Sequence, residues 1–136
     1  MQFREDDIEH ADVIVNHFGY WPSFHDAEII SVKFFRDMEK SVASLEMRIY
    51  VFEVTGKLME GFLEQTKHCF IDLEFVGLGA SEIGGFNTQN VVDRLRFGKR
   101  GDLLFCELKS TYGAGGYIEA AEIRVQKLTL GMSQHE

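Results

Sequence analysis

Long apolar runs, paired cysteines and a basic leader are all missing from this sequence. No hydrophobic stretch approaches the roughly 20 residues that a membrane-spanning helix needs. The first ten residues, MQFREDDIEH, carry acids where a signal peptide needs a basic region followed by an apolar one. We therefore expect a cytoplasmic chain with no membrane partner. Cys69 and Cys106 each lie alone in an apolar run, which predicts buried free thiols rather than a disulfide or a zinc site.

Basic residues are also scarce. Lys and Arg number 14 against 22 Asp and Glu, which gives a formal net charge of -8. Such a surface repels phosphate backbones, so nucleic-acid binding through a basic patch is disfavoured. The same charge suits a basic protein partner, although simple solubility is an equally ordinary reason for it.

The sequence does contain enough apolar material for a core. Hydrophobic residues make up 45% of the 136-residue chain, which includes 12 Phe. A chain of this length without repeats or linkers predicts one domain over residues 1–136. We expect an N-terminal helix with its connector at 1–22, an antiparallel sheet at 23–130 and a tail at 131–136.

The first expected element is a helix over residues 7–18. Asp6 is placed to cap its start, and Gly19 suits the left-handed position after its last turn. An apolar stripe at helical spacing is formed by Ile8, Ala11, Ile14, Val15 and Phe18.

From residue 28 onward apolar residues recur at every second position, which is the period of a strand. Residues expected to face inward include Ile30, Phe34, Ala43 and Ala121. The expected strands are 28–37, 42–54, 68–77, 91–97, 103–110 and 117–130, and the segment 55–67 is expected to be a connecting loop. One helix followed by about six strands predicts a mainly β (or α+β) fold, with a mostly antiparallel sheet that forms a curled sheet, a half-barrel or a sandwich.

The stretch FHDAE holds the first candidate site, His25, Asp26 and Glu28. An adjacent His–Asp pair is familiar from metal-dependent phosphohydrolases. In a strand, however, neighbouring side chains point to opposite faces, so His25 and Asp26 should not reach one ion. We predict no metal site, no cofactor and no catalytic residue, and we favour a polar corner that organises the turn from helix to sheet. Recognition of a partner or ligand by these residues, or metal-assisted hydrolysis, are the alternatives.

Two further polar stretches and one aromatic residue are candidates for binding. Asn87, Gln89 and Asn90 in GGFNTQN supply amide groups that shape loops or make contacts but lack a group for acid–base catalysis. Tyr112 lies in STYGAGGY, which is rich in glycine but lacks the Lys of a phosphate-binding loop. Trp21, the one tryptophan, is either an interface anchor or a core residue.

Three stretches together resemble a known family. FGYWPSFHDAEI, GFNTQNVVDRLRF and STYGAGGYIEAAEIRV look like the small bacterial domains of the Imm50 type, which are immunity proteins of polymorphic toxin systems. The likeness covers most of the chain in order. It implies a single cytoplasmic domain that binds and neutralises a cognate toxin, and it implies no catalytic residues.

These observations leave three hypotheses for the function. The first is a non-enzymatic protein-binding domain whose partner is a cognate toxin. The second is a small metal-assisted hydrolase that uses His25, Asp26 and Glu28. The third is a half-barrel that binds a small ligand in an apolar pocket ringed by Asn87, Gln89 and Tyr112. The open edge of the expected sheet also allows a homodimer.

Overall fold

A computed structural model describes residues 2–131, which form one short α-helix and six strands. The elements are η1 (Glu5–Asp7), α1 (Asp12–Phe18), β1 (Glu28–Asp37), β2 (Val42–Met59), β3 (Phe62–Gly84), β4 (Val92–Arg100), β5 (Leu103–Ser110) and β6 (Gly115–Leu130). Neighbouring strands are all antiparallel, in the order β1-β2-β3-β6-β5-β4, and the sheet is not closed. The prediction of a mainly β fold with one antiparallel sheet is confirmed.

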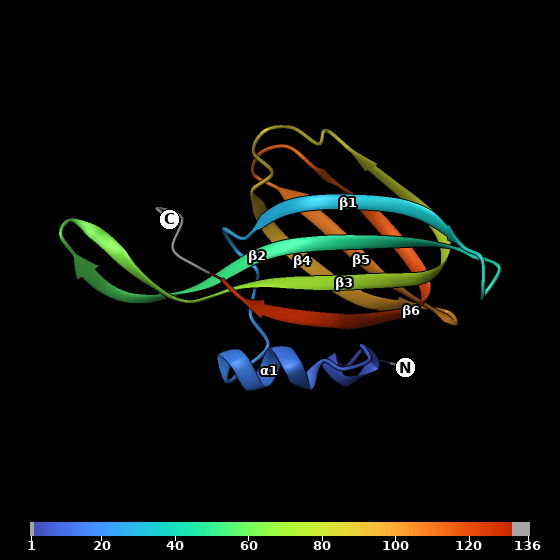
Figure 1. The fold of residues 1–136 in the computed structure, drawn as a ribbon, viewed down its shortest axis with the longest axis horizontal. Coiled ribbons are helices and arrows are strands. Elements are labelled where there is room, and N and C mark those ends of the chain that lie inside the picture. Colours follow the sequence, from blue (N-terminus) through green and yellow to red (C-terminus); the bar gives the residue numbers. More distant parts are fainter. Residues whose placement is uncertain (1, 132–136) are drawn as a thin grey trace.

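The sheet curls so that its two halves cover one another. β1, β2, β3 and β6 lie side by side in one layer, and β4 and β5 cross behind them (Figure 1). Apolar side chains from both layers form a common core. Glu28 and Val91 form an isolated antiparallel bridge, which joins the starts of the two outermost strands, β1 and β4. Within the described residues, no helix has the length and apolar character needed to cross a membrane.

The α-helix begins later than predicted, and the reason lies in the sheet. The backbone N–H of Glu9 donates to the carbonyl of Ile123, and the Glu9 carbonyl accepts from the N–H of Val125, both at 2.9 Å. This short parallel contact with β6 holds the chain out of a helical conformation before α1. Asp6 therefore does not cap α1, which has no side-chain cap at its N-terminus.

The C-terminal end of α1 agrees with the prediction. Gly19 follows the last turn with φ 89°, and its N–H donates to the carbonyl of Val15 at 2.6 Å. The apolar stripe is kept, because Ile8, Ile14 and Phe18 are fully buried in the core.

A β-bulge changes which residues of β1 face the core. The pairing of β1 with β2 shifts between Ile29 and Ser31. Ile29 is consequently buried, whereas Ile30, which we expected to face inward, is 42% exposed. The extra residue of a bulge reverses the alternation on one side of it, and sequence periodicity does not reveal where that occurs.

Three other expected core residues are exposed. Phe34 is 52% exposed, and Ala43, which follows the same β1–β2 turn, is also exposed. Phe34 lies three residues before the end of β1, and Ala43 is the second residue of β2, so both are close to that turn. Ala121 is exposed because its neighbour Gly77 has no side chain that could cover it. The prediction that these three residues belong to the core is wrong.

The segment expected to be a loop, 55–67, consists almost entirely of strand. β2 continues to Met59 and β3 begins at Phe62, so that a two-residue turn joins them. Its residues, Glu60 and Gly61, have φ values of 51° and 86°, as a type I′ hairpin turn requires. Two register shifts, between Val51 and Glu53 and between Val54 and Leu58, interrupt the alternation that would have marked the hairpin in the sequence. Gly56, with φ 85°, lies in the second.

The remaining strands lie where they were predicted, but β3 is much longer than the expected 68–77, since it extends from Phe62 to Gly84. Cys69, Ile71, Leu73 and Phe75 of β3 are fully buried. The segment 117–130, which contains Glu-Ala-Ala-Glu, forms a strand rather than a helix. Of the predicted tail, only Gly131 belongs to the described residues, and residues 132–136 lie outside them.

Candidate functional site

The polar stretches singled out in the sequence meet at one place, which we call the corner (residues 24–29, 87–92 and 110–114). Backbone hydrogen bonds join the three segments. The N–H of Ile29 donates to the carbonyl of Asn90 at 2.8 Å, and the N–H of Val91 donates to that of Tyr112 at 3.0 Å. The N–H of Asp26 donates to the carbonyl of Val92 at 2.9 Å. Seven of the predicted site residues thus share one region of the fold. They are His25, Asp26, Glu28, Asn87, Gln89, Asn90 and Tyr112.

His25 and Asp26 lie in a turn before β1 and not in the strand. Phe24 and Asp26 both adopt the left-handed conformation, with φ 63° and 66°. This geometry brings Nε2 of His25 to 3.5 Å from Oδ1 of Asp26. The argument that strand alternation keeps these two side chains apart is therefore wrong.

The imidazole of His25 also contacts Asp93 at the start of β4. Its Nδ1 donates to the Asp93 carbonyl at 3.0 Å and lies 3.6 Å from the Asp93 carboxylate. The hydrogen bond to the Asp93 backbone and the nearby charges of Asp26 and Asp93 raise the pKa of His25 above its usual value. Lys109 is 4.0 Å from the other carboxylate oxygen of Asp93, which extends the ion-pair network to β5.

The His–Asp contact does not by itself form a metal site. Within the part of the chain that the structure describes, no group of three His, Cys, Asp or Glu side chains is arranged to hold a metal ion. Glu28 takes part in the corner through its backbone, in the bridge to Val91. The geometry that His25 and Asp26 do show is that of a polar clamp between β1 and β4.

Asn90 is the buried centre of the corner. It is 2% exposed, and its Oδ1 accepts from the N–H of Asn87 at 2.8 Å and from that of Ala114 at 3.0 Å. Its Nδ2 donates to the Asn87 carbonyl at 2.8 Å. Gly113 packs so closely that a Cβ there would lie 2.4 Å from Oδ1 of Asn90. Asn90 therefore organises loops, whereas Asn87 and Gln89 themselves are exposed.

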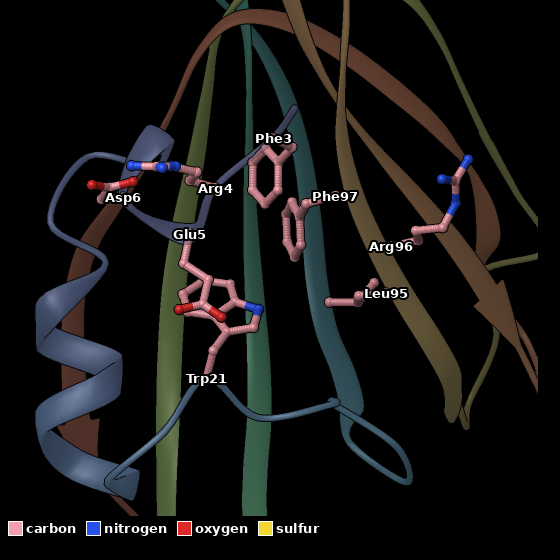
Figure 2. A pocket seen from close by; sticks show the side chains of 8 residues that line it. All are labelled: Phe3, Arg4, Glu5, Asp6, Trp21, Leu95, Arg96 and Phe97. Carbon is pink, nitrogen blue, oxygen red and sulfur yellow. The ribbon is translucent and has the colours of Figure 1, made fainter. Parts of the chain in front are cut away.

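Trp21 lies apart from these amides, in a hollow of about 700 Å³ (Figure 2). Its ring meets those of Phe24 and Phe97 edge to face, with centroids 5.7 and 5.8 Å away. Phe3 stacks on Phe97 at 6.2 Å. The walls are aromatic, and the rim carries charges of both signs, from Arg4 and Arg96 and from Glu5 and Asp6. Such a hollow suits an apolar side chain better than a polar substrate.

The N-terminal wall of this hollow is fixed by an acidic residue. The backbone N–H of Arg4 donates to Asp7 at 2.7 Å, and Lys99 of β4 lies 3.4 Å from the same carboxylate. The Arg4 hydrogen bond is the main cause that lowers the pKa of Asp7. Sequence reasoning missed Phe3 and Phe97 as neighbours of Trp21, because only the curled sheet brings the N-terminus beside β4.

The two cysteines take no part in a reactive site. Cys69 and Cys106 are free and buried, as predicted. Burial raises the pKa of the Cys69 thiol to about 11, and burial also raises that of Cys106. Both groups therefore stay protonated near neutral pH and behave as small apolar side chains.

Comparison with known proteins gives one match. The family model described as immunity protein 50, Imm50, matches residues 10–131. Neither the curated proteins nor the solved structures contain a match to the chain. The matched range includes the corner and all six strands, and it confirms the resemblance carried by the three sequence stretches. The chain belongs to the Imm50 family.

Proposed function

We propose that this protein is an immunity protein that binds a toxin protein and neutralises it without catalysing a reaction. The observation that carries the proposal is the family match, which extends over nearly the whole described chain. The net charge of -8 supports a basic partner. We further propose that it acts in the cytoplasm.

Two features supply candidate contacts for the toxin. The hollow beside Trp21 offers an aromatic surface with charges of both signs at its rim, which fits an apolar side chain of a partner. The exposed polar residues of the corner, His25, Asp26, Gln89 and Tyr112, lie on the outside of a hydrogen-bonded scaffold. We propose both as parts of a binding surface.

The alternatives from the sequence receive less support. A metal-assisted hydrolase needs a third ligand near His25 and Asp26, and no such group of side chains occurs within residues 2–131. A small-ligand site ringed by Asn87, Gln89 and Tyr112 would need a pocket there, but the hollow at Trp21 is lined by other residues.

Co-expression with a candidate toxin encoded by a neighbouring gene tests the proposal. We expect the wild-type chain to restore growth of cells that express the toxin, and a chain with an early stop codon to leave them inhibited. Calorimetry with an inactivated form of the same toxin should then give a 1:1 complex. A folded, soluble wild-type chain that neither restores growth nor binds would contradict the proposal.

A further inference from the structure

The hairpin between β2 and β3 extends beyond the rest of the sheet (Figure 1), and we call its residues 53–66 the arm. β1 pairs with β2 only as far as Tyr50, and β6 pairs with β3 only as far as Cys69. In the arm, the two strands therefore pair only with one another. A two-stranded hairpin of this kind is marginally stable by itself in water. Packing against the core does not explain why a small protein has such an arm.

The arm carries a cluster of exposed apolar side chains. Phe62 is 77% exposed and Leu58 is 70% exposed. The exposed large apolar residues of the arm are Val54, Leu58, Met59, Phe62 and Leu63. Single exposed apolar residues are ordinary on a protein surface, but a cluster at the tip of a projecting element is typical of an interaction site.

These side chains lie on both faces of the arm. Leu58 pairs with Leu63 across the hairpin, and the next residue, Met59, pairs with Phe62. Successive residues of a strand point to opposite faces, so one apolar pair lies on each face. A flat partner would cover only one pair. A cleft that closes around the tip would cover both.

The root of the arm is fixed to the end of α1. Nζ of Lys67 lies 3.0 Å from Glu53 and donates to the carbonyl of Phe18 at 3.0 Å. The ring of His17 donates to the Lys67 carbonyl at 2.8 Å, and Tyr20 donates to Glu53 at 2.9 Å. This network holds the direction of the arm, which lowers the entropic cost of placing its tip in a partner.

The charge of the arm and of the whole chain indicates what kind of partner the arm binds. The arm carries three acids, Glu53, Glu60 and Glu64, and one base, Lys57. With the net charge of -8 on the whole chain, two copies that met through their arms would repel one another. A basic protein would be attracted instead.

We propose that the arm inserts its tip into an apolar cleft of a basic protein, and that this protein is the toxin. The inference rests on the proposed immunity function and adds the segment that makes the contact. Leu58 and Leu63 contact one wall of the cleft, and Met59 and Phe62 contact the other. Glu60 and Glu64 face basic groups at its rim.

Binding of the purified, inactivated toxin to Leu58→Ser and Phe62→Ser tests the inference. Met38→Ser is a matched control, because Met38 is 76% exposed but lies in the β1–β2 turn, away from the arm. We expect each arm variant to raise the Kd by roughly 30-fold or more, which is the loss typical of a hot-spot side chain. The control should bind within about twofold of the wild type. Thermal unfolding of all three should match the wild type, since the replaced side chains are exposed.

The outcomes of this experiment test the role of the arm and the proposed immunity function separately. Wild-type binding with no loss in either arm variant would overturn the role of the arm and leave the immunity function standing. A loss in only one variant would overturn insertion into a cleft, because a flat contact touches one face. A wild-type dimer in light scattering that Phe62→Ser converts to a monomer would make a second copy the occupant and overturn the inference. If the wild-type chain does not bind the toxin, the proposed function itself fails.

Discussion

At the scale of single residues, the corner is held by side chains that bond to the backbone of other segments. Asn90 reaches two loops with one amide group. His25 reaches β4 through the carbonyl of Asp93. Each of these side chains supplies a hydrogen-bond partner to backbone groups that have no partner in regular secondary structure. Polar side chains are therefore common where loops meet.

Replacing Asn90 by Ala should destabilise the fold strongly. The change leaves the buried N–H of Ala114 and the part-buried N–H and carbonyl of Asn87 without their side-chain partner, and we expect a loss of about 3 kcal/mol in the free energy of unfolding. Urea denaturation measures it. Asn87→Ala is the control, since its exposed side chain accepts only from Thr88 and its loss should cost about 0.5 kcal/mol. Equal stability of the two variants would show that Asn90 is not the centre of the corner.

The stability that His25 contributes should depend on pH. Its pKa is raised in the folded state, first by the hydrogen bond to Asp93 and then by the charge of Asp26. Because the pKa is higher in the folded state, His25 stabilises the fold fully at a pH below 6.5, the pKa of the unfolded chain. This stabilisation is lost as the pH rises through the pKa of the folded state. The stability advantage of the wild type over His25→Gln should therefore be larger at acidic pH and should shrink as the pH rises through the folded pKa.

An NMR titration of the His25 ring gives the direct check on this expectation. Asp26→Asn should move the measured pKa back toward 6.5. A wild-type value at or below 6.5 would contradict the geometry of the clamp.

At the scale of elements, two long strands determine the shape of the sheet. β3 and β6 pair along most of their length, with register shifts after Asp72 and between Leu78 and Ser81. Bulges increase local twist, so they allow one sheet to curl until β4 and β5 lie behind β1 and β2. The arm is a continuation of β2 and β3 past the point where their outer neighbours, β1 and β6, end.

Gly116→Ala should disrupt the pairing of β6 with β3. A Cβ at this position would lie 1.9 Å from the carbonyl oxygen of Glu82, which is backbone and cannot rotate away. We expect a loss of about 3 kcal/mol or more in the free energy of unfolding, measured by chemical denaturation. Gly84→Ala, near the same end of the pair, is the control, because no atom lies within 4 Å of its added Cβ. Similar stability of both variants would argue against the close approach of the strands.

At the scale of the whole molecule, the net charge and the shape of the surface affect how the protein associates with a partner. The chain has a net charge of -8, and the arm and the hollow at Trp21 are its candidate contact features. Long-range attraction brings a basic partner to such a surface, and short-range apolar contacts then hold it.

The association rate with the inactivated toxin should fall as salt is added. Raising the NaCl concentration from about 0.05 to about 0.5 M shortens the range of electrostatic attraction, and we expect the association rate constant to drop by about tenfold. The dissociation rate constant should change far less, since apolar contacts dominate it. Stopped-flow or surface-based kinetics would measure both, and an association rate insensitive to salt would contradict steering by charge.

Several parts of the fold could be predicted because they depend on local pattern. The alternation in 68–75 places four side chains in the core, and Gly19 ends α1, both as expected. The start of α1 could not be predicted, because Glu9 bonds to β6 across a distance of more than 100 residues. The hairpin at Glu60 and Gly61 was missed for the opposite reason, since a local bulge hid its alternation.

The sequence alone determined the strand-rich composition, the acidic charge, the isolated cysteines and the family, since each follows from residue type and order. Only the tertiary structure decided that His25 meets Asp26 and Asp93, that Asn90 is buried, and that the arm leaves its apolar residues in solvent. The physical reason is that bulges and the curl of the sheet decide which side chains meet. The curl arises from contacts between segments distant in the chain, and the positions of the bulges do not follow from residue type alone.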